Sequence, residues 1–278
     1  MNVTVHNGEV EITGVPDFNL SKTFECGQCF RWNKDETGVY SGVAFGHVAR
    51  LRQCGENVHI SCSMDVFEKL WRDYFDLDRD YAIIRRQLCV DEFMQSATTF
   101  GAGIRILRQD KWEALCSFII SQNNNIPRIK NIVEALCVNY GERFVSNGKD
   151  YYTFPSAQTI GAISIERLEH LRCGYRAAYI SKAAKAVASG ELDLEALSCD
   201  PPDNVRIQLK KLHGVGDKVA DCMMLFGLHM LDVFPRDVWI NRAVAANYGE
   251  NFDPGIFSPY AGIAQQYIFH YTRNGMQM

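Results

Sequence analysis

The sequence has no apolar run long enough to cross a membrane, and its amino terminus has no export signal. A membrane helix needs about 18 successive apolar residues, whereas the longest obvious run, from Ala114 to Ile120, is seven residues. The first residues, MNVTVHNGEV, lack the charged-then-apolar pattern of a secretory signal. We therefore expect an intracellular protein without a membrane partner.

The sequence also has few residues at the spacing that metal ligands require, although it contains ten cysteines. Cys26 and Cys29 form the only C-x-x-C pair, and no second pair or nearby histidine completes a four-ligand site. No cysteine follows Cys222, which excludes a four-cysteine iron–sulfur cluster near the carboxyl terminus. Scattered cysteines in a reducing compartment are usually small buried apolar residues. We expect no metal site, and a zinc or redox role for Cys26 and Cys29 is the minor alternative.

The chain lacks the excess of basic residues that marks proteins holding nucleic acid by bulk charge. It carries 29 Lys+Arg against 33 Asp+Glu, a net charge of −4. Residues 1–97 have a net charge of −5, and residues 98–278 have +1. Any nucleic acid must therefore be bound through local arrangement and helix ends. With 47% apolar and 22% charged residues, the composition excludes a disordered chain.

The hydrophobic period changes near residue 97, which predicts an α+β protein of two domains. Residues 1–97 are predicted to form an antiparallel β-sheet domain, with flanking helices near Met64–Tyr74 and Tyr81–Phe93. Residues 98–278 are predicted to form a helical domain. Its expected helices are Trp112–Ile120, one starting at Pro127, then about 156–162, 165–171, 177–189, 203–212, Asp217–Met230, Val238–Tyr248 and one from about Pro259.

The segment from Leu209 to Cys222 carries the most chemical information. A predicted helix ends at Leu212, His213-Gly-Val-Gly216 forms a tight turn, and a second helix starts with Asp217 available as its cap. Two glycines one residue apart let the backbone approach a ligand closely. Backbone N–H groups at a helix start form an anion site that suits a DNA phosphate. An ordinary helical hairpin, with glycine serving only the turn, is the alternative that the glycines alone leave open.

Two ionisable residues follow this turn. Lys218 lies at the helix start, where the helix dipole disfavours a cation, and a lysine acts as a nucleophile only after it loses its proton. Asp237 comes nineteen residues later, after Phe234-Pro-Arg and before an apolar-periodic helix, so it is predicted to be an N-cap. A capped carboxylate is held ionised and can oppose a developing cation if the lysine faces it. A solvated lysine and a plain cap explain the same residues without chemistry.

These stretches resemble known DNA repair enzymes. HGVGDKVADC followed by FPRDVW is similar to the helix-hairpin-helix glycosylase signature. Further stretches resemble 8-oxoguanine DNA glycosylases, and the similarity runs in order from about residue 18 to residue 270: Cys26–Trp32, Ser121–Ile129, Leu171–Ala177 and Pro259–Phe269. The resemblance implies a twisted antiparallel sheet domain followed by an all-α domain, with the helix-hairpin-helix at about 203–231.

The activity that this resemblance implies is that of a monomeric, bifunctional glycosylase and abasic-site lyase acting on double-stranded DNA that contains 8-oxoguanine. Lys218 would attack C1′ of the flipped-out nucleotide and form a Schiff base, from which β-elimination nicks the DNA strand. Asp237 would stabilise the cationic sugar. The resemblance implies no required cofactor. A structural monovalent or divalent cation at the hairpin is compatible with it. For such an enzyme we expect a cytoplasmic, nucleoid-associated location in a prokaryote or a nuclear location in a eukaryote.

The resemblance also assigns the walls of a base pocket. The carbonyl of Gly27 would read the N7 hydrogen that distinguishes 8-oxoguanine from guanine. Cys222 and Phe269 would sandwich the base, and Gln265 would bond to its pairing edge. Phe226 stands near this pocket where the family has a methionine, which changes the expected shape. Without the family, Gly27 is a turn glycine, and Cys222 and Phe269 are core residues.

A second group of matched residues would hold the rest of the duplex. Asn123 would fill the vacated position in the base stack beside the wedge Tyr175, while Arg128 and Arg176 would hold the estranged cytosine and predict a preference for cytosine opposite the lesion. Without the family, Arg176 is a surface charge. Trp239 replaces a histidine that contacts a phosphate in animal and fungal members. The expected hairpin contacts to phosphate are His213, Gly214, Val215 and Gly216.

Two rival functions remain open at this point. Within the same fold, the lesion could be a formamidopyrimidine or an alkylated base, although Lys218 argues against a monofunctional glycosylase. In a different class, the chain could be a DNA-binding module that performs no chemistry. Such a module would not need Lys218 and Asp237 together, so substitution of Lys218 separates the two.

Overall fold

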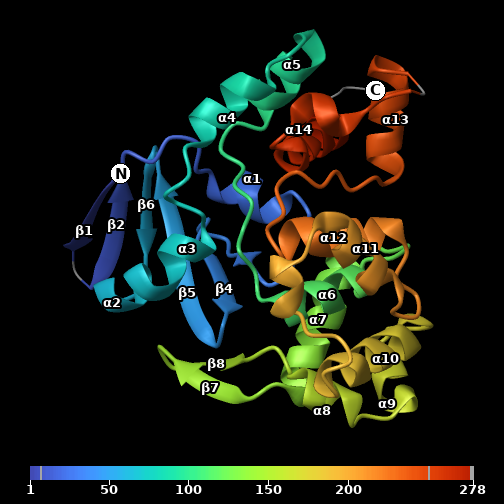
Figure 1. The fold of residues 1–278 in the computed structure, drawn as a ribbon. Coiled ribbons are helices and arrows are strands. Elements are labelled where there is room, and N and C mark those ends of the chain that lie inside the picture. The colour runs from blue at the N-terminus through green and yellow to red at the C-terminus, as the bar shows by residue number, and fades with distance from the viewer. Residues whose placement is uncertain (7, 250, 276–278) are drawn as a thin grey trace.

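The computed structural model describes residues 1–6, 8–249 and 251–275, which form an antiparallel sheet beside a larger helical body (Figure 1). The α+β class predicted from the sequence is confirmed. Within the described residues, the large sheet has six strands, and all neighbouring strands are antiparallel. Their order is β1 (Asn2–His6), β2 (Glu9–Thr13), β6 (Asn57–Ile60), β5 (His47–Cys54), β4 (Tyr40–Ala44) and β3 (Asn33–Lys34).

Alternation of apolar residues gives this sheet one buried face. Ile60 pairs with Val10 on one side and with Leu51 on the other, and all three side chains are buried. This face packs against aromatic side chains from α1 (Leu20–Glu25), and from the segment that comprises α2 (Met64–Val66), the π-helical turn η1 (Phe67–Trp71) and α3 (Arg72–Tyr74). Trp32 stacks on Phe24 at 4.5 Å between ring centroids, so the loop after α1 is fixed to the sheet core.

The helical body is organised around α6 (Lys111–Ile120), where every residue from Ala114 to Ile120 is buried. Helices α10 (Arg176–Ala188) and α12 (Asp217–Phe226) pack against it. The remaining elements are α4 (Tyr81–Leu88), α5 (Glu92–Phe100), α7 (Ile126–Tyr140), α8 (Ala157–Gly161), α9 (Ile165–Glu169), η2 (Ala196–Cys199), α11 (Pro202–Lys210), α13 (Val238–Asn247), η3 (Pro254–Phe257) and α14 (Ala261–Asn274). No helix of the described residues has both the length and the apolar character that a bilayer crossing requires.

Two predicted helices differ from the structure, and one hairpin was missed. The single helix expected over Tyr81–Phe93 is wrong, because the chain breaks after α4 and Asp91 caps a new helix, α5. The helix expected to reach Met230 ends at Phe226, before Gly227. The hairpin of β7 (Arg143–Ser146) and β8 (Lys149–Tyr152) was not predicted. Its turn residues Asn147 and Gly148 both have positive φ, as a tight hairpin requires.

The sheet and the helical body share elements across residue 97. Tyr81, Ile84 and Leu88 of α4 and Met94 of α5 belong to the core of the helical body, although they precede that residue. The extended segment between α5 and α6 runs along both parts (Figure 1). The division at residue 97 stays a prediction about folding units.

Candidate active site

A groove of about 890 Å³ opens where the loop after α6 meets the amino-terminal ends of α12 and α13 and the last turns of α14. A smaller cavity of about 70 Å³ adjoins it. Five residues from distant parts of the chain line both the groove and the cavity: Gly27, Phe118, Lys218, Asp237 and Phe269. The two predicted catalytic residues therefore lie where the groove and the smaller cavity meet.

Lys218 occupies the first turn of α12, as the sequence predicted. Its Nζ donates a hydrogen bond to Oγ of Ser121 at 3.0 Å and lies 5.7 Å from the ring centroid of Phe118. No carboxylate of the described residues lies within 4.0 Å of this amine. The amine is thus held by a hydroxyl group beside an aromatic wall, at the mouth of the cavity. Sequence reasoning missed Ser121 because its role depends on a contact across 97 residues.

Asp237 is the N-cap of α13, which confirms the prediction for this helix start. One carboxylate oxygen accepts a hydrogen bond from the backbone N–H of Ile240 at 2.8 Å. Asp237 itself lines both the groove and the cavity. The cap fixes the position of a charged oxygen pair at the edge of the reacting space.

The prediction that Asp217 caps α12 is wrong. Gly216 occupies the N-cap position and has no side chain to donate or accept, while the carboxylate of Asp217 pairs with Nζ of Lys210 on α11 at 2.5 Å. Because Asp217 is already helical, its side chain points toward α11. The first N–H groups of α12 consequently have no side-chain cap, and they remain available to an anion.

The small cavity has the walls that the sequence assigned to a base pocket. The backbone at Gly27 (φ +83°) passes close to Phe269, and a β-carbon at this position would lie 3.5 Å from Cε1 of that ring. Cys222 is buried, and burial raises the pKa of its thiol to about 11 although the charge of Lys218 acts to lower it. The thiol is therefore uncharged near neutral pH. Phe226 stacks on Phe118 at 5.2 Å.

Two glutamines of α14 that line this cavity have polar atoms without a hydrogen-bond partner among the described residues. Gln265 and Gln266 are both buried, and within the described residues the Oε1 atom of each has no hydrogen-bond partner. A buried acceptor without a donor is uncommon, and these two oxygens are free to accept a hydrogen bond from a group that enters the cavity. Gln265 was predicted as a pocket residue, whereas Gln266 was not. The doublet in the sequence was its only signal.

The predicted duplex-contacting residues lie around the loop after α6 and the turn before α12. Asn123 lies at the tip of the loop after α6 with φ of +45°, and its Nδ2 atom is 3.3 Å from the hydroxyl oxygen of Tyr175. The ring of Tyr175 is half exposed and contacts Tyr179 at 5.5 Å between centroids. Tyr179 in turn meets the ring of His213 at 5.1 Å. An unbroken row of aromatic contacts therefore joins the predicted wedge to the hairpin.

The two predicted arginines have different surroundings. Arg128 is exposed and near the carbonyl of Arg172. Arg176 is buried, so the alternative of a surface charge is wrong. Its guanidinium donates to the backbone carbonyls of Gln122, Asn123 and Cys173. Arg176 therefore supports the loop that carries Asn123, and it can reach a base only by exchanging some of these contacts.

The hairpin glycines serve different purposes. Gly214 has φ of +85°, and a β-carbon there would lie 2.3 Å from the ring of Tyr179. The fold therefore requires glycine at this position. Gly216 is extended, and a β-carbon there would meet nothing within 4 Å. Val215 between them is buried. The open space at Gly216 lies over the uncapped start of α12.

Cys26 and Cys29 do not form a ligand pair in this structure. Both thiols are buried, and burial raises the pKa of Cys26 to about 12 and that of Cys29 well above its usual range. Metals bind thiolates, which such burial disfavours. Among the described residues, no three His, Cys, Asp or Glu side chains are placed to hold a metal.

Comparison with known proteins identifies the family of the chain. Residues 12–115 match the family described as "8-oxoguanine DNA glycosylase, N-terminal domain", and residues 116–254 match the "HhH-GPD superfamily base excision DNA repair protein". An N-glycosylase/DNA lyase of Saccharomyces cerevisiae is 33% identical over 255 residues, which cover 82% of this chain and 68% of the relative.

Two solved structures match nearly the whole chain, each covering 98% of both chains with a TM-score of 0.93. One is the Clostridium acetobutylicum 8-oxoguanine glycosylase/lyase in complex with double-stranded DNA containing cytosine opposite 8-oxoguanine, at 36% identity. The other is MBOgg1 in complex with a low-affinity DNA ligand, at 44% identity.

Proposed function

Because the chain belongs to the 8-oxoguanine DNA glycosylases of the helix-hairpin-helix superfamily, and is a DNA N-glycosylase with abasic-site lyase activity, we propose that it excises 8-oxoguanine opposite cytosine through a Schiff base on Lys218. The observation that carries this proposal is the position of Lys218 and Asp237. Both stand at the mouth of a cavity lined by Gly27, Cys222 and Gln265. Enzymes of this superfamily generally need no cofactor.

The chemistry requires a neutral amine and a stabilised sugar cation. A base stacked in duplex DNA is out of reach, so the nucleotide is flipped into the cavity. Asp237 opposes the positive charge that develops on the sugar as the glycosidic bond breaks. The Nζ atom of Lys218 bonds to C1′, the bond from C1′ to N9 breaks, and the departing base takes up the proton that the attached amine releases. The bond from C1′ to the ring oxygen O4′ then breaks, O4′ takes up a proton from water, and a protonated imine joins C1′ to Nζ.

The lyase step follows from that imine. Its positive charge makes the C2′ hydrogen acidic, and removal of this proton expels the 3′ phosphate, which nicks the DNA strand by β-elimination. Hydrolysis of the imine returns Lys218 as the free amine. The hydroxyl of Ser121, 3.0 Å from this amine, holds it at the cavity mouth before attack.

The lesion is distinguished at a single atom. 8-Oxoguanine carries a hydrogen on N7, whereas guanine has a lone pair there. The carbonyl of Gly27 accepts a hydrogen bond from N7–H of 8-oxoguanine. In guanine the same carbonyl would face the N7 lone pair, and two buried acceptors that face each other without a hydrogen are unfavourable. The aromatic ring of Phe269 and the neutral thiol of Cys222 stack on the two faces of the base. The unpaired Oε1 atom of Gln265 accepts a hydrogen bond from the pairing edge of the base.

Recognition of the opposite cytosine uses Arg128 and Arg176. Arg128 is exposed on the first turn of α7, and Arg176 donates to the loop that carries Asn123. Insertion of Asn123 and Tyr175 into the stack brings both guanidinium groups to the estranged base. We further propose a monomer in solution, and a cation bound by hairpin carbonyls around His213–Gly216 when DNA is present.

The hairpin glycines give a paired prediction. Gly216→Ala is expected to leave thermal unfolding unchanged but to weaken duplex binding about tenfold, because its β-carbon would stand between the α12 amides and a phosphate. Gly214→Ala is expected to lose about 1–3 kcal/mol of stability, since its positive φ and the Tyr179 ring oppose a β-carbon. Calorimetry and binding to an abasic-analogue duplex measure both effects. Unchanged binding by Gly216→Ala would mean that no phosphate approaches this backbone.

The proposed function is tested with wild-type protein and duplexes that carry 8-oxoguanine opposite each of the four bases. Borohydride is expected to trap a covalent protein–DNA adduct, and single-turnover excision is expected to be about tenfold or more faster opposite cytosine. Equal rates opposite all four bases would refute the arginine assignment. Absence of an adduct from protein that binds the duplex would point to another lesion or to a module without chemistry.

A further inference from the structure

Gln28, the residue after Gly27, is completely buried, and its side chain is fully engaged with the backbone. Its Nε2 donates to the carbonyls of Thr23 at 2.9 Å and Arg105 at 2.7 Å, and its Oε1 accepts from the N–H of Leu107 at 2.9 Å. These partners belong to α1 and to the extended segment between α5 and α6. Gln28 therefore fastens the Gly27 loop to both.

The side chain of Gln28 also contacts Cys26, the residue before Gly27. Its Nε2 atom donates to the buried sulfur of Cys26 at 3.4 Å, and that thiol donates to the carbonyl of Thr23 in α1 at 3.3 Å. Cys26 and Gln28 flank Gly27 in the chain, so these bonds fix both of its neighbours to α1. The direction of the Gly27 carbonyl is restricted as a result.

Gln109 connects this loop to the catalytic helix. Its Nε2 donates to the carbonyl of Gln28 at 2.8 Å, and the same atom lies 3.5 Å from the carbonyl of Phe226 at the end of α12. Phe226 lines the cavity. One half-buried amide thus spans the gap between the wall that carries Gly27 and the helix that carries Lys218.

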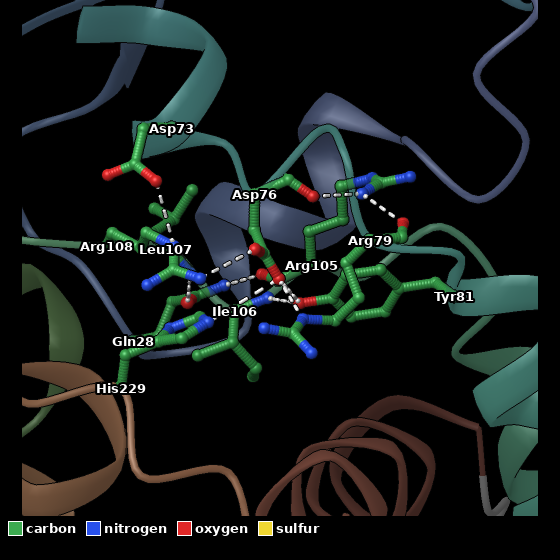
Figure 2. Close-up of polar contacts among 10 residues, drawn as sticks. All are labelled: Gln28, Asp73, Asp76, Arg79, Tyr81, Arg105, Ile106, Leu107, Arg108 and His229. Carbon is green, nitrogen blue, oxygen red and sulfur yellow. Dashed lines mark hydrogen bonds and ion pairs between the residues drawn. The ribbon is translucent and has the colours of Figure 1, made fainter. Parts of the chain in front are cut away.

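The segment that bears Gln109 is itself anchored by a polar cluster centred on Asp76 (Figure 2). The carboxylate of Asp76 accepts hydrogen bonds from Arg79 at 2.7 Å, Tyr81 at 3.0 Å and Arg108 at 3.2 Å. The hydroxyl of Tyr81 also accepts from the N–H of Ile106 at 3.0 Å. These contacts hold the backbone of residues 105–108 on which Gln28 rests.

A histidine brings the catalytic helix into the same cluster. His229, just beyond α12, places its Nε2 atom 3.5 Å from the carboxylate of Asp76. Burial alone would raise the pKa of Asp76, but His229 and Arg79 outweigh it and hold this pKa well below its usual range. The carboxylate of Asp76 therefore stays charged near neutral pH. Burial lowers the pKa of His229, so His229 faces this carboxylate as a neutral imidazole at that pH.

From these contacts we infer that Gln28 and Gln109 are positioning residues, which aim the Gly27 carbonyl at N7 of the flipped base and set its distance from α12. This inference rests on the proposed function, because it takes Gly27 as the group that reads the lesion. Neither glutamine touches the base. Their effect is on selectivity for 8-oxoguanine over guanine, and not on duplex binding in general.

The test uses Gln109→Met, which keeps the size of the side chain but loses the donor, in a Lys218→Gln background that cannot turn over. Affinity is measured for three duplexes of one sequence that place 8-oxoguanine, guanine or a tetrahydrofuran abasic analogue opposite cytosine. Gln109→Met is expected to lose about tenfold of its preference for 8-oxoguanine over guanine, about 1.4 kcal/mol. Its affinity for the abasic analogue is expected to stay within twofold, since no base is read there.

A matched control is available in Gln53, which also bridges two backbone groups of the sheet domain, accepting from Leu20 and donating to Phe18. Gln53→Met is expected to lower stability without changing the preference. Should Gln109→Met fail to fold, Gln109→Glu replaces the donating amide with an acceptor and is expected to give the same loss.

The possible outcomes separate the inference from the function on which it rests. An unchanged preference in the Gln109 variants, or an equal fall in affinity for all three duplexes, overturns the positioning role. If the Lys218→Gln parent itself shows no preference for 8-oxoguanine over guanine, the reading by Gly27 fails and the inference fails with it.

Discussion

Lys218→Gln is expected to yield no borohydride-trapped adduct and to excise 8-oxoguanine slower by about 10³-fold or more, as loss of a nucleophile does. The glutamine side chain retains a polar end near Ser121, so the fold and the groove are preserved. Without the amine, no bond to C1′ forms and no imine exists to acidify C2′. Single-turnover excision and borohydride trapping on an 8-oxoguanine–cytosine duplex measure both losses.

The control for this experiment is Lys69→Gln, since Lys69 is an exposed lysine of the sheet domain paired with Asp65 and remote from the groove. It is expected to behave as wild type in both assays. Lys218→Gln should still bind the lesion duplex within a few-fold of wild type. A trapped adduct with Lys218→Gln would show that another amine forms the Schiff base, and the assignment of Lys218 would be abandoned.

Asp237→Asn is expected to slow base excision by about 10²-fold, the size of effect seen when one group that stabilises transition-state charge is removed. Asparagine caps helices about as well as aspartate, so the hydrogen bond to the N–H of Ile240 is retained and stability changes by less than about 1 kcal/mol. The variant therefore removes the charge and keeps the structure. Cleavage of a preformed abasic site should fall less than excision, because no base leaves in that reaction.

Asp80→Asn is the matched control for the cap. Asp80 accepts from the N–H of Ile83 at the start of α4 in the same manner, away from the groove. The Asp80→Asn protein should have the same thermal unfolding temperature as the Asp237→Asn protein. Its excision rate should equal that of the wild type. If Asp237→Asn also excises at the wild-type rate, its role is confined to capping α13.

Residues that line the site could be predicted from the sequence. The contacts that hold those residues in place could not. Lys218, Asp237 and the glycines of the turn belong to short local patterns, in which a helix start and a loop follow from residue order alone. The roles of Ser121 and Gln109 depend on partners far away in the chain, and no periodicity indicates such partners. Their functions became visible only with the tertiary arrangement.

Local patterns also gave wrong results where two of them competed. Aspartate is a residue type that N-caps favour, which is why Asp217 was predicted to cap α12. Gly216 already takes the extended conformation that an N-cap needs, and this leaves Asp217 inside the helix. The β7–β8 hairpin was missed because it interrupts a stretch of helical period, although Asn147-Gly148 is a strong turn signal. Arg176 faces the protein because nearby carbonyls satisfy its guanidinium when no DNA is bound.

The packing of α5 against α14 has a consequence for synthesis on the ribosome. The rings of Phe93 and Phe100 on α5 meet Tyr271 on α14 at 6.0 and 5.7 Å between centroids, and 160 residues separate Phe100 from Ala261. At about 5–20 residues per second, this length takes roughly 10–30 s to translate. The aromatic side of α5 therefore stays without its α14 partner while α12 and α13 are being made, and the core closes over it only after α14 has emerged.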